Sequence, residues 1–235
     1  MDQYERTRML IGGEGLARLR AARVAVFGVG GVGGYVVEAL ARSGVGALDL
    51  IDSDTVCLSN LNRQIIATRE TVGRYKVDVA AERVASIDPE ITVRTYRTFY
   101  LPETADEFDF TRYDYIVDAI DTVAGKIVLA LNARKAGTPI ISALGTGNKF
   151  DPTKLAIGDI YETSVCPLAR VMRRELRRRG VERLTVLWSD EEPVKPLTPE
   201  EASSRRGLPG STAFVPGAGG LIIAGKVVRD LIGLV

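Results

Sequence analysis

A glycine-rich turn between a predicted strand and a predicted helix constrains the fold of this chain most strongly. Residues 23–27 form a short, β-branched apolar run, which is typical of a strand buried in a parallel sheet. Residues 32–43 place apolar side chains at helical spacing. Between them, a glycine turn lets backbone amides at a helix N-terminus approach a phosphate. By itself this turn fits NAD, FAD or ATP equally well. Its glycines are Gly28, Gly30, Gly31 and Gly33.

Strand-like and helix-like segments alternate along most of the chain. This alternation predicts an α/β fold, a Rossmann-like doubly wound and mostly parallel sheet with ligands at the carboxyl ends of its strands. We expect one domain over 1–235, with a nucleotide-binding core over about 22–150 and an elaborated C-terminal part over about 151–235. The predicted strands are 23–27, 47–52, 91–96, 113–119, 139–142, 155–160 and 184–188; the predicted helices are 32–43, 76–87, 123–136, 167–179 and 219–231; a mobile loop is predicted over about 190–210.

Composition excludes several classes of site. The chain of 235 residues contains no histidine, so the commonest general base and metal ligand is missing. Two cysteines are too few for a tetracysteine zinc site. The N-terminus lacks the apolar core of a secretory signal, which favours a cytoplasmic protein. Residues 207–225 carry no charge, but prolines and glycines interrupt them, so we predict a buried helix and no membrane insertion.

The segment after the second predicted strand favours a triphosphate over a dinucleotide. Asp52 lies at the end of that strand, about 20 residues beyond the glycine turn, where a carboxylate can accept hydrogen bonds from a ribose. That pair of features still fits both NAD and ATP. Arg63 offers a bidentate fork for phosphate oxygens, and Lys76 a point charge at a helix start. Asp121 closes the fourth predicted strand, where its carboxylate can hold Mg²⁺ or cap the following helix.

Five motifs with linked spacing resemble the ThiF/MoeB-type adenylating family, which is related to ubiquitin-activating enzymes. The resemblance implies ATP as the bound nucleotide and a carboxylate as the group that it activates. It also implies Mg²⁺. The motifs are Gly28-x-Gly30-Gly31-Val32-Gly33, Asp52-x-Asp54-x-Val56, Asn60-x-Asn62-Arg63-Gln64, Gly73-x-x-Lys76 and Asp118-x-x-Asp121.

The family resemblance also implies roles for single residues. Asp52 would bind the ribose, Asn60, Arg63 and Lys76 the phosphates, and Asp121 the magnesium ion. The remaining implied nucleotide-binding residues are the four glycines of the turn, Asp54 and Gln64.

The family further implies a homodimer in which an N-terminal arginine enters the partner subunit's ATP site. Arg6 is the best match for that arginine, and the neighbouring Arg8 is the alternative.

Within this family the chain is most similar to the tRNA threonylcarbamoyladenosine dehydratase branch. Members of that branch activate the carboxylate of threonylcarbamoyladenosine in tRNA as an acyl-adenylate, and the modification then closes into a ring with net loss of water. The resemblance leaves open a sulfur-transfer partner protein. The residues that carry the similarity to the dehydratase branch are Glu38 to Gly44, Asp118 to Asp121, Gly145-x-Gly147-x-x-x-Asp151-Pro152-Thr153 and Pro167-Leu168-Ala169.

Two alternatives to this function remain at the level of sequence. One is activation of a ubiquitin-like sulfur-carrier protein, against which the missing zinc cysteines argue. The other is a nicotinamide-dependent oxidoreductase, which the set from Asn60 to Gln64 with Lys76 disfavours.

Cys166 and an arginine-rich helix each have a functional and a structural interpretation. Related activating enzymes use a cysteine nucleophile, but some members of the dehydratase branch carry Asp before Pro-Leu-Ala, so we expect Cys166 not to be an obligatory nucleophile. The arginines form either a solvated face or, as the resemblance favours, a surface for tRNA phosphates. They are Arg170, Arg173, Arg174, Arg177, Arg178 and Arg179.

Overall fold

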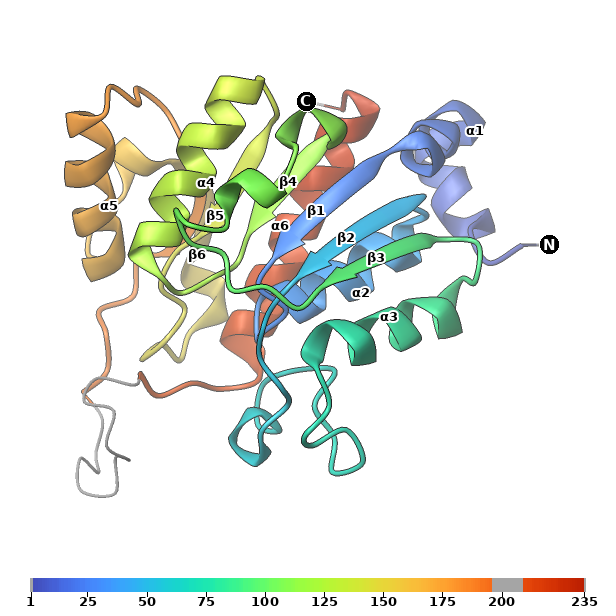
Figure 1. The fold of residues 1–235 in the computed structure, drawn as a ribbon, viewed down its shortest axis with the longest axis horizontal. Coiled ribbons are helices and arrows are strands. Elements are labelled where there is room, and N and C mark those ends of the chain that lie inside the picture. Colours follow the sequence, from blue (N-terminus) through green and yellow to red (C-terminus); the bar gives the residue numbers. More distant parts are fainter. Residues whose placement is uncertain (1, 196–208, 235) are drawn as a thin grey trace.

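A seven-stranded sheet forms the centre of the computed structural model, which describes residues 2–195 and 209–234 (Figure 1). The strand order is β3-β2-β1-β4-β5-β7-β6, and every neighbouring pair is parallel except β6 with β7. The α/β, Rossmann-like, doubly wound fold predicted from the sequence is therefore confirmed. The strands are β1 (Arg23–Phe27), β2 (Ala47–Ile51), β3 (Thr92–Tyr96), β4 (Tyr115–Asp118), β5 (Ile140–Ala143), β6 (Leu155–Asp159) and β7 (Thr185–Ser189).

Helices cover both faces of the sheet, because side chains alternate between its faces along each strand. Val24 and Val26 join the core beneath α2, α3 and α6, whereas Ala25 and Phe27 join the core beneath α4. In Figure 1, α2 and α6 lie behind the sheet and α4 lies in front of it. The helices are α1 (Glu5–Ala21), α2 (Gly33–Ser43), α3 (Lys76–Ile87), α4 (Val123–Ala136), α5 (Pro167–Arg178) and α6 (Phe214–Ile232), with short 3₁₀ turns at Leu58–Asn60, Ala105–Glu107, Phe110–Arg112, Pro152–Lys154 and Ile160–Glu162.

Two helices differ from the sequence-based prediction. The helix α6 begins at Phe214 rather than at residue 219, because Pro216 lies in the first turn, where a backbone N–H has no helical acceptor to lose. The helix α1 was not predicted at all. It has little amphipathic pattern, and Gly12 interrupts it with a φ of 71°. Most of the predicted loop over 190–210 lies outside the described residues.

A buried ion pair joins the end of β4 to α4 and β5. The Lys126 ammonium donates to Asp118 Oδ1 at 2.9 Å and to the carbonyl oxygen of Ala143 at 2.7 Å. Both charged side chains are fully buried. One ammonium group thus connects three elements directly beneath the turn that carries Asp121.

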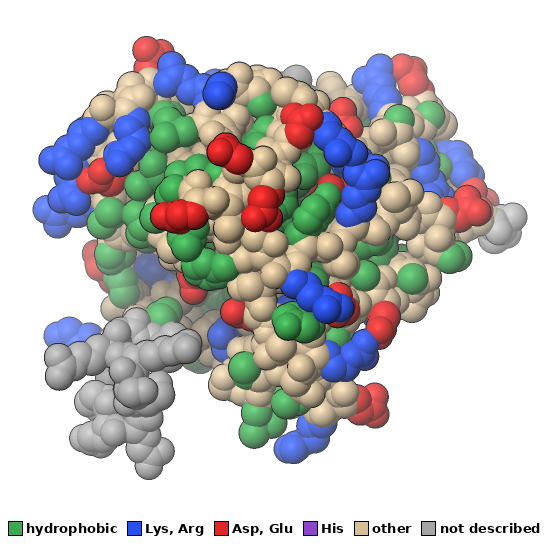
Figure 2. All heavy atoms as spheres, viewed as in Figure 1, with side chains coloured by type: hydrophobic (Ala, Val, Ile, Leu, Met, Phe, Trp, Pro, Cys, Tyr) green, Lys and Arg blue, Asp and Glu red, His purple; other side chains and the backbone are tan. Residues whose placement is uncertain are grey.

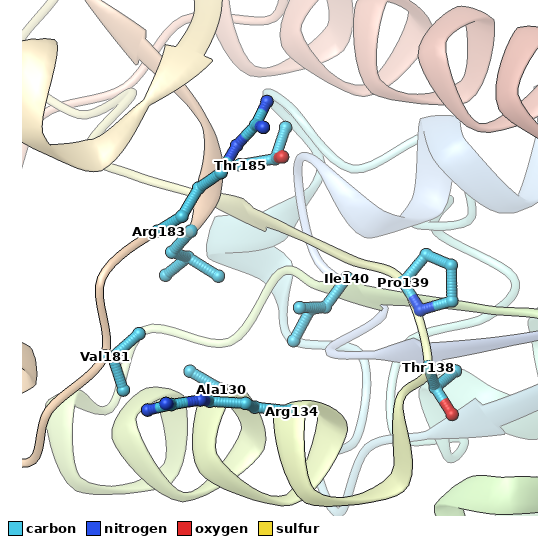
Figure 3. A pocket seen from close by; sticks show the side chains of 9 residues that line it. Ala130, Arg134, Thr138, Pro139, Ile140, Val181, Arg183 and Thr185 are labelled. Atoms are coloured by element: carbon cyan, nitrogen blue, oxygen red, sulfur yellow. The ribbon is translucent and has the colours of Figure 1, made fainter.

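The edges of the sheet differ in character. The glycine turn, Asp52 and Asp121 follow β1, β2 and β4, respectively, at the carboxyl edge. A hollow of about 260 Å³ lies instead at the amino edge, between the last turn of α4 and the starts of β5 and β7 (Figure 3). In that view Arg134 lies along α4 on one side, and Arg183 lies on the other. Among the described residues, no helix is long and apolar enough to cross a membrane.

Candidate nucleotide-binding site

The glycine turn has two glycines that its tight backbone requires and one, Gly30, that leaves space. Gly28 has a φ of 89°, and a Cβ there would lie 2.6 Å from the carbonyl oxygen of Ala119. A Cβ at Gly33 would lie 1.8 Å from the carbonyl oxygen of Gly28. By contrast, a Cβ at Gly30 would have only Gln64 Nε2 within 4 Å, at 3.8 Å. Gly28 and Gly33 therefore permit the tight turn, and Gly30 keeps an open approach to the backbone.

The amides of this turn are available to a ligand. The N–H groups of Gly30, Gly31 and Val32 have no acceptor among the described residues. They lie just before the N-terminus of α2, where the helix dipole also favours negative charge. The turn therefore provides an anion site suited to phosphate.

Replacing Gly30 with alanine should weaken ATP binding about tenfold and leave the fold intact. The added methyl group meets no backbone atom of the protein, but it occupies the space through which a phosphate would approach the amides. Isothermal titration calorimetry would measure the ATP affinity, and thermal unfolding would measure stability. Gly225→Ala is the matched control, because a Cβ there also has nothing within 4 Å and lies on α6. Equal ATP affinities of the two variants would contradict the assignment.

Asp52 ties the end of β2 to the glycine turn. Its carboxylate accepts hydrogen bonds at 2.8 Å from the amides of Val29 and Asp54. Burial raises the pKa of this carboxyl group, while the charge of nearby Lys76 and the two amides oppose that rise. A carboxylate has about four acceptor positions, so capacity remains for a ribose hydroxyl.

Lys76 is held at the start of α3 by two carboxylates. Its ammonium lies 2.7 Å from Asp54 Oδ2 and 3.9 Å from Asp52 Oδ2, and the lysine is 6% exposed. Asp54 is largely exposed. A phosphate that binds Lys76 therefore competes with Asp54 for the ammonium.

The 3₁₀ turn after β2 and the residues that follow it place three further predicted residues near the glycine turn. Asn60 Oδ1 accepts the Cys57 amide at 3.0 Å, which gives Asn60 a structural role in the turn. The Arg63 guanidinium donates to the Ser59 carbonyl oxygen and to Asn62 Oδ1, both at 3.0 Å.

Gln64 is the third of these residues. It is 6% exposed, and its Oε1 has no partner among the described residues. A buried acceptor without a donor is costly, so a donor group from a bound ligand would stabilise it.

Asp121 follows β4 in a turn that packs against the glycine turn. Gly28 lies against the backbone of Ala119 and Ile120. The Asp121 side chain is exposed, and its one hydrogen bond comes from the Thr122 hydroxyl at 3.4 Å. No cluster of three metal-ligating side chains occurs within the described ranges. A single carboxylate at this place fits Mg²⁺, which commonly takes one protein carboxylate together with phosphate oxygens and water.

The structure separates Arg6 from the other predicted site residues. Tyr4 donates to the Ala41 carbonyl oxygen and to Asp88, which fixes the start of α1 near the amino edge of the sheet. Arg6 is exposed there, and it forms no ion pair with a described residue, whereas Arg8 pairs with Asp2. Arg6 therefore lies on the opposite edge from the glycine turn of its own chain, and it is freer than Arg8 to contact another molecule.

Cys166 is buried at the start of α5. It is 2% exposed and packs within a core cluster that includes Ala169 and Met172. A Cβ at Gly145 would lie 3.5 Å from its sulfur. A nucleophile must reach its substrate, so this position favours packing as the role of Cys166.

Lys and Arg side chains gather at the end of the molecule formed by α5 (Figure 2). Several of these arginines have partners within the chain. Glu175 pairs with Arg174, Arg178 and Arg179. The Arg177 guanidinium lies 4.9 Å from the centre of the Tyr161 ring. Part of the predicted basic surface is therefore neutralised, and its contact with tRNA stays a prediction.

Sequence reasoning missed a connection between the phosphate end of the site and the C-terminal part. Asn62 Nδ2 donates to the Ser211 carbonyl oxygen at 3.0 Å. The adjacent Gly210 amide donates to Asn148 Oδ1 at 2.6 Å. These contacts join residues far apart in the chain, and no local motif signals them.

Known proteins are similar to this chain over almost its whole length. The model of the ThiF family matches residues 4–233. The tRNA threonylcarbamoyladenosine dehydratase of Bacillus subtilis is 43% identical to this chain, over 99% of this chain and 95% of that protein. The crystal structure of the Escherichia coli tRNA N6-threonylcarbamoyladenosine dehydratase in complex with AMP superimposes with a TM-score of 0.90 at 32% identity, covering 98% of this chain and 94% of that one. The structure of the same enzyme in complex with ATP gives a TM-score of 0.89, with the same coverage. On these grounds, the chain belongs to the ThiF family.

Proposed function

We propose that this protein uses ATP to activate the carboxylate of threonylcarbamoyladenosine in tRNA, and that it then dehydrates the modification to its cyclic form. The observation that carries this proposal is a glycine turn with free backbone amides, joined to Asp52 and packed against the turn that carries Asp121. This turn lies in a chain that is similar over 99% of its length to a tRNA threonylcarbamoyladenosine dehydratase. Relatives named as adenylyltransferase and sulfurtransferase match a smaller part, 57% of this chain. Activation of a sulfur carrier is therefore not favoured.

The reaction proceeds in two steps. An oxygen of the substrate carboxylate attacks the α-phosphorus of ATP, pyrophosphate leaves, and an acyl-adenylate forms. A nucleophilic group of the same modification then attacks the activated carbonyl carbon, AMP leaves with the carboxylate oxygen, and the attacking group loses its proton. The net change in the nucleoside is the loss of one water. Positioning and charge neutralisation supply most of such catalysis, which suits a site without histidine.

The residues of the site divide this work. The free amides of the glycine turn and Arg63 hold the phosphates, and Lys76 joins them when it leaves Asp54. Asp52 holds the ribose, and Gln64 offers its unpartnered oxygen to the nucleotide. Asp121 holds Mg²⁺, which supplies charge neutralisation at the phosphates when bound.

Nucleoside mass spectrometry tests the proposal directly. Wild-type protein with Mg·ATP and threonylcarbamoylated tRNA should yield a nucleoside lighter by one water. An unchanged nucleoside, together with ATP–pyrophosphate exchange that requires a protein ending in Gly-Gly, would support the carrier-activating function instead. That result would also indicate a sulfur-transfer partner protein, which the family resemblance allows.

We further propose that the protein works as a cytoplasmic homodimer in which residues 1–235 form one adenylating unit. The location of Arg6 at the amino edge of its own sheet supports a role in the partner subunit's ATP site. Exposed apolar side chains on α1 and α6 supply a surface for a second copy. They include Met9, Leu10, Leu221 and Ile222.

Mixing two inactive variants tests this arrangement. Arg6→Ala and Asp121→Ala should each be inactive alone. After subunit exchange in an equal mixture, roughly a quarter of wild-type activity should return, because half of the dimers are mixed and each mixed dimer contains one intact site. Activity per total protein after exchange provides the measurement, and unmixed variants at the same concentration provide the control. A mixture that stays inactive although exchange is complete would place Arg6 in the site of its own chain. An Arg6→Ala variant that is active alone would place Arg6 outside catalysis.

A further inference from the structure

Lys149 stands apart among the three buried lysines. Lys76 pairs with Asp54, and Lys126 pairs with Asp118. Lys149 is 4% exposed, and its Nζ has no hydrogen-bond partner among the described residues. Burying an ammonium group without an anion is energetically unfavourable. An anion that binds next to Lys149 would offset that cost.

The backbone on both sides of Lys149 is held firmly. The Asn148 amide donates to the Gly210 carbonyl oxygen at 2.8 Å, and the Asn148 carbonyl oxygen accepts from the Val194 amide at 2.8 Å. On the other side, the amides of Phe150 and Asp151 donate to the Glu191 carboxylate at 2.9 Å. These hydrogen bonds fix the backbone from which the Lys149 side chain extends, so its starting point is set before a ligand binds.

Nearby carboxylates are engaged elsewhere. Both oxygens of Glu191 accept the two amides just described. Asp151 accepts from the amide and the hydroxyl of Thr153. Asp190 accepts from Trp188 Nε1 at 2.8 Å and from the Ser164 hydroxyl at 3.0 Å. None of these groups forms an ion pair with Lys149, so the described part of the chain leaves its charge uncompensated.

The order of the strands puts the segment that carries Lys149 on one side of Asp121 and the glycine turn on the other. The glycine turn follows β1 and Asp52 follows β2, whereas Asp121 follows β4 and the segment with Lys149 follows β5. Along the carboxyl edge the order is β2, β1, β4, β5. A phosphate bound at the glycine turn lies over β1. A group that reaches this phosphate by passing Asp121, at the end of β4, therefore approaches from the side of β5. The contacts from Asn148 through Gly210 and Ser211 to Asn62 keep this segment close to the phosphate end.

We propose that Lys149 binds the carboxylate of the threonylcarbamoyl substrate as it approaches the α-phosphate. This inference rests on the proposed function. Two anions must meet in the first step, and a cation on the carboxylate reduces their repulsion and fixes the attacking oxygen. The amides of the glycine turn, Arg63 and Lys76 already serve the phosphates from the other side. Lys149 completes the site with a cation for the acyl group.

Kinetics and binding of Lys149→Met test this assignment. We expect kcat/KM for threonylcarbamoylated tRNA to fall about 100-fold, while the Kd for ATP stays within about twofold of wild type. Lys149→Arg should recover part of the loss. Lys154→Met removes an exposed lysine from the same segment, and it should behave as wild type. Thermal unfolding of each variant controls for folding, and Lys149→Gln serves as a second neutral variant if Lys149→Met is unstable.

A binding measurement without turnover provides a second readout. In the presence of the ATP analogue AMPCPP, wild type should bind threonylcarbamoylated tRNA more tightly than the same tRNA with plain adenosine, and Lys149→Met should lose this difference. A variant that keeps both the preference and the wild-type kcat/KM would overturn the inference. A parallel loss of ATP affinity would also overturn it, because Lys149 would then be a phosphate ligand. Failure of wild type to dehydrate the nucleoside would instead overturn the proposed function.

Discussion

Replacing Asp121 with alanine is expected to lower kcat/KM for the dehydration of threonylcarbamoylated tRNA by about 1,000-fold or more. The carboxylate is exposed at the carboxyl end of β4, and its single hydrogen bond to Thr122 is long. Its removal should therefore leave the fold intact, while the Mg²⁺ ion that we propose at the phosphates loses its protein ligand. The measurement is the rate of cyclic nucleoside formation by mass spectrometry, with Mg²⁺ varied at saturating ATP.

Asp106→Ala is the matched control for this variant. Asp106 is also exposed, and it lies in the 3₁₀ turn Ala105–Glu107 between β3 and β4. It should keep wild-type rates. Asp121→Asn should lose nearly as much activity as Asp121→Ala, because an amide is a poor ligand for Mg²⁺. A loss below about tenfold in either Asp121 variant would exclude Asp121 as the metal ligand.

Replacing Lys126 with methionine should cost about 3–5 kcal/mol in the free energy of unfolding, the largest stability effect that we expect. The substitution leaves the Asp118 carboxylate fully buried with no cation beside it, and Asp118 Oδ2 has no partner even in the wild type. It also leaves the Ala143 carbonyl oxygen without its donor. Urea denaturation followed by circular dichroism would measure the change.

Two further variants separate charge from packing. Lys135→Met lies on an exposed position of the same helix and should change stability by less than about 0.5 kcal/mol. The double variant Asp118→Leu with Lys126→Met removes both charges, so it should recover much of the loss. If the double variant is less stable than Lys126→Met alone, packing around these residues matters more than the ion pair.

The central sheet could be predicted from the sequence because its strands are short apolar runs with clear boundaries. The strand predicted over 23–27 agrees with β1, and the other six agree within two residues at each end. The alternation of these strands with amphipathic helices predicts the fold, because local residues encode both patterns. The helix α1 escaped prediction because its burial depends on tertiary contacts of few residues, among them Leu16 and Leu19.

The candidate site was predictable where its residues follow strands in linked motifs. Asp52 and the glycine turn are near one another in the structure, joined by the hydrogen bond from the Val29 amide. The ion pair between Lys76 and Asp54 was not foreseen, although both residues were singled out, because a motif does not reveal which charges meet. Lys149 could not be recognised either, since burial without a partner is a property of the folded chain.

The contact between Lys76 and Asp54 has a consequence for how the site discriminates among anions. Because Asp54 already neutralises the ammonium, the site presents little net positive charge before ATP arrives. Before ATP binds, Asp54 is the counter-ion of Lys76, and ATP binding replaces this carboxylate with a phosphate. A small anion that offers a single contact gains little from such an exchange. A triphosphate, which also engages the amides of the glycine turn, gains enough to displace the carboxylate, so selectivity arises from the number of simultaneous contacts rather than from charge alone.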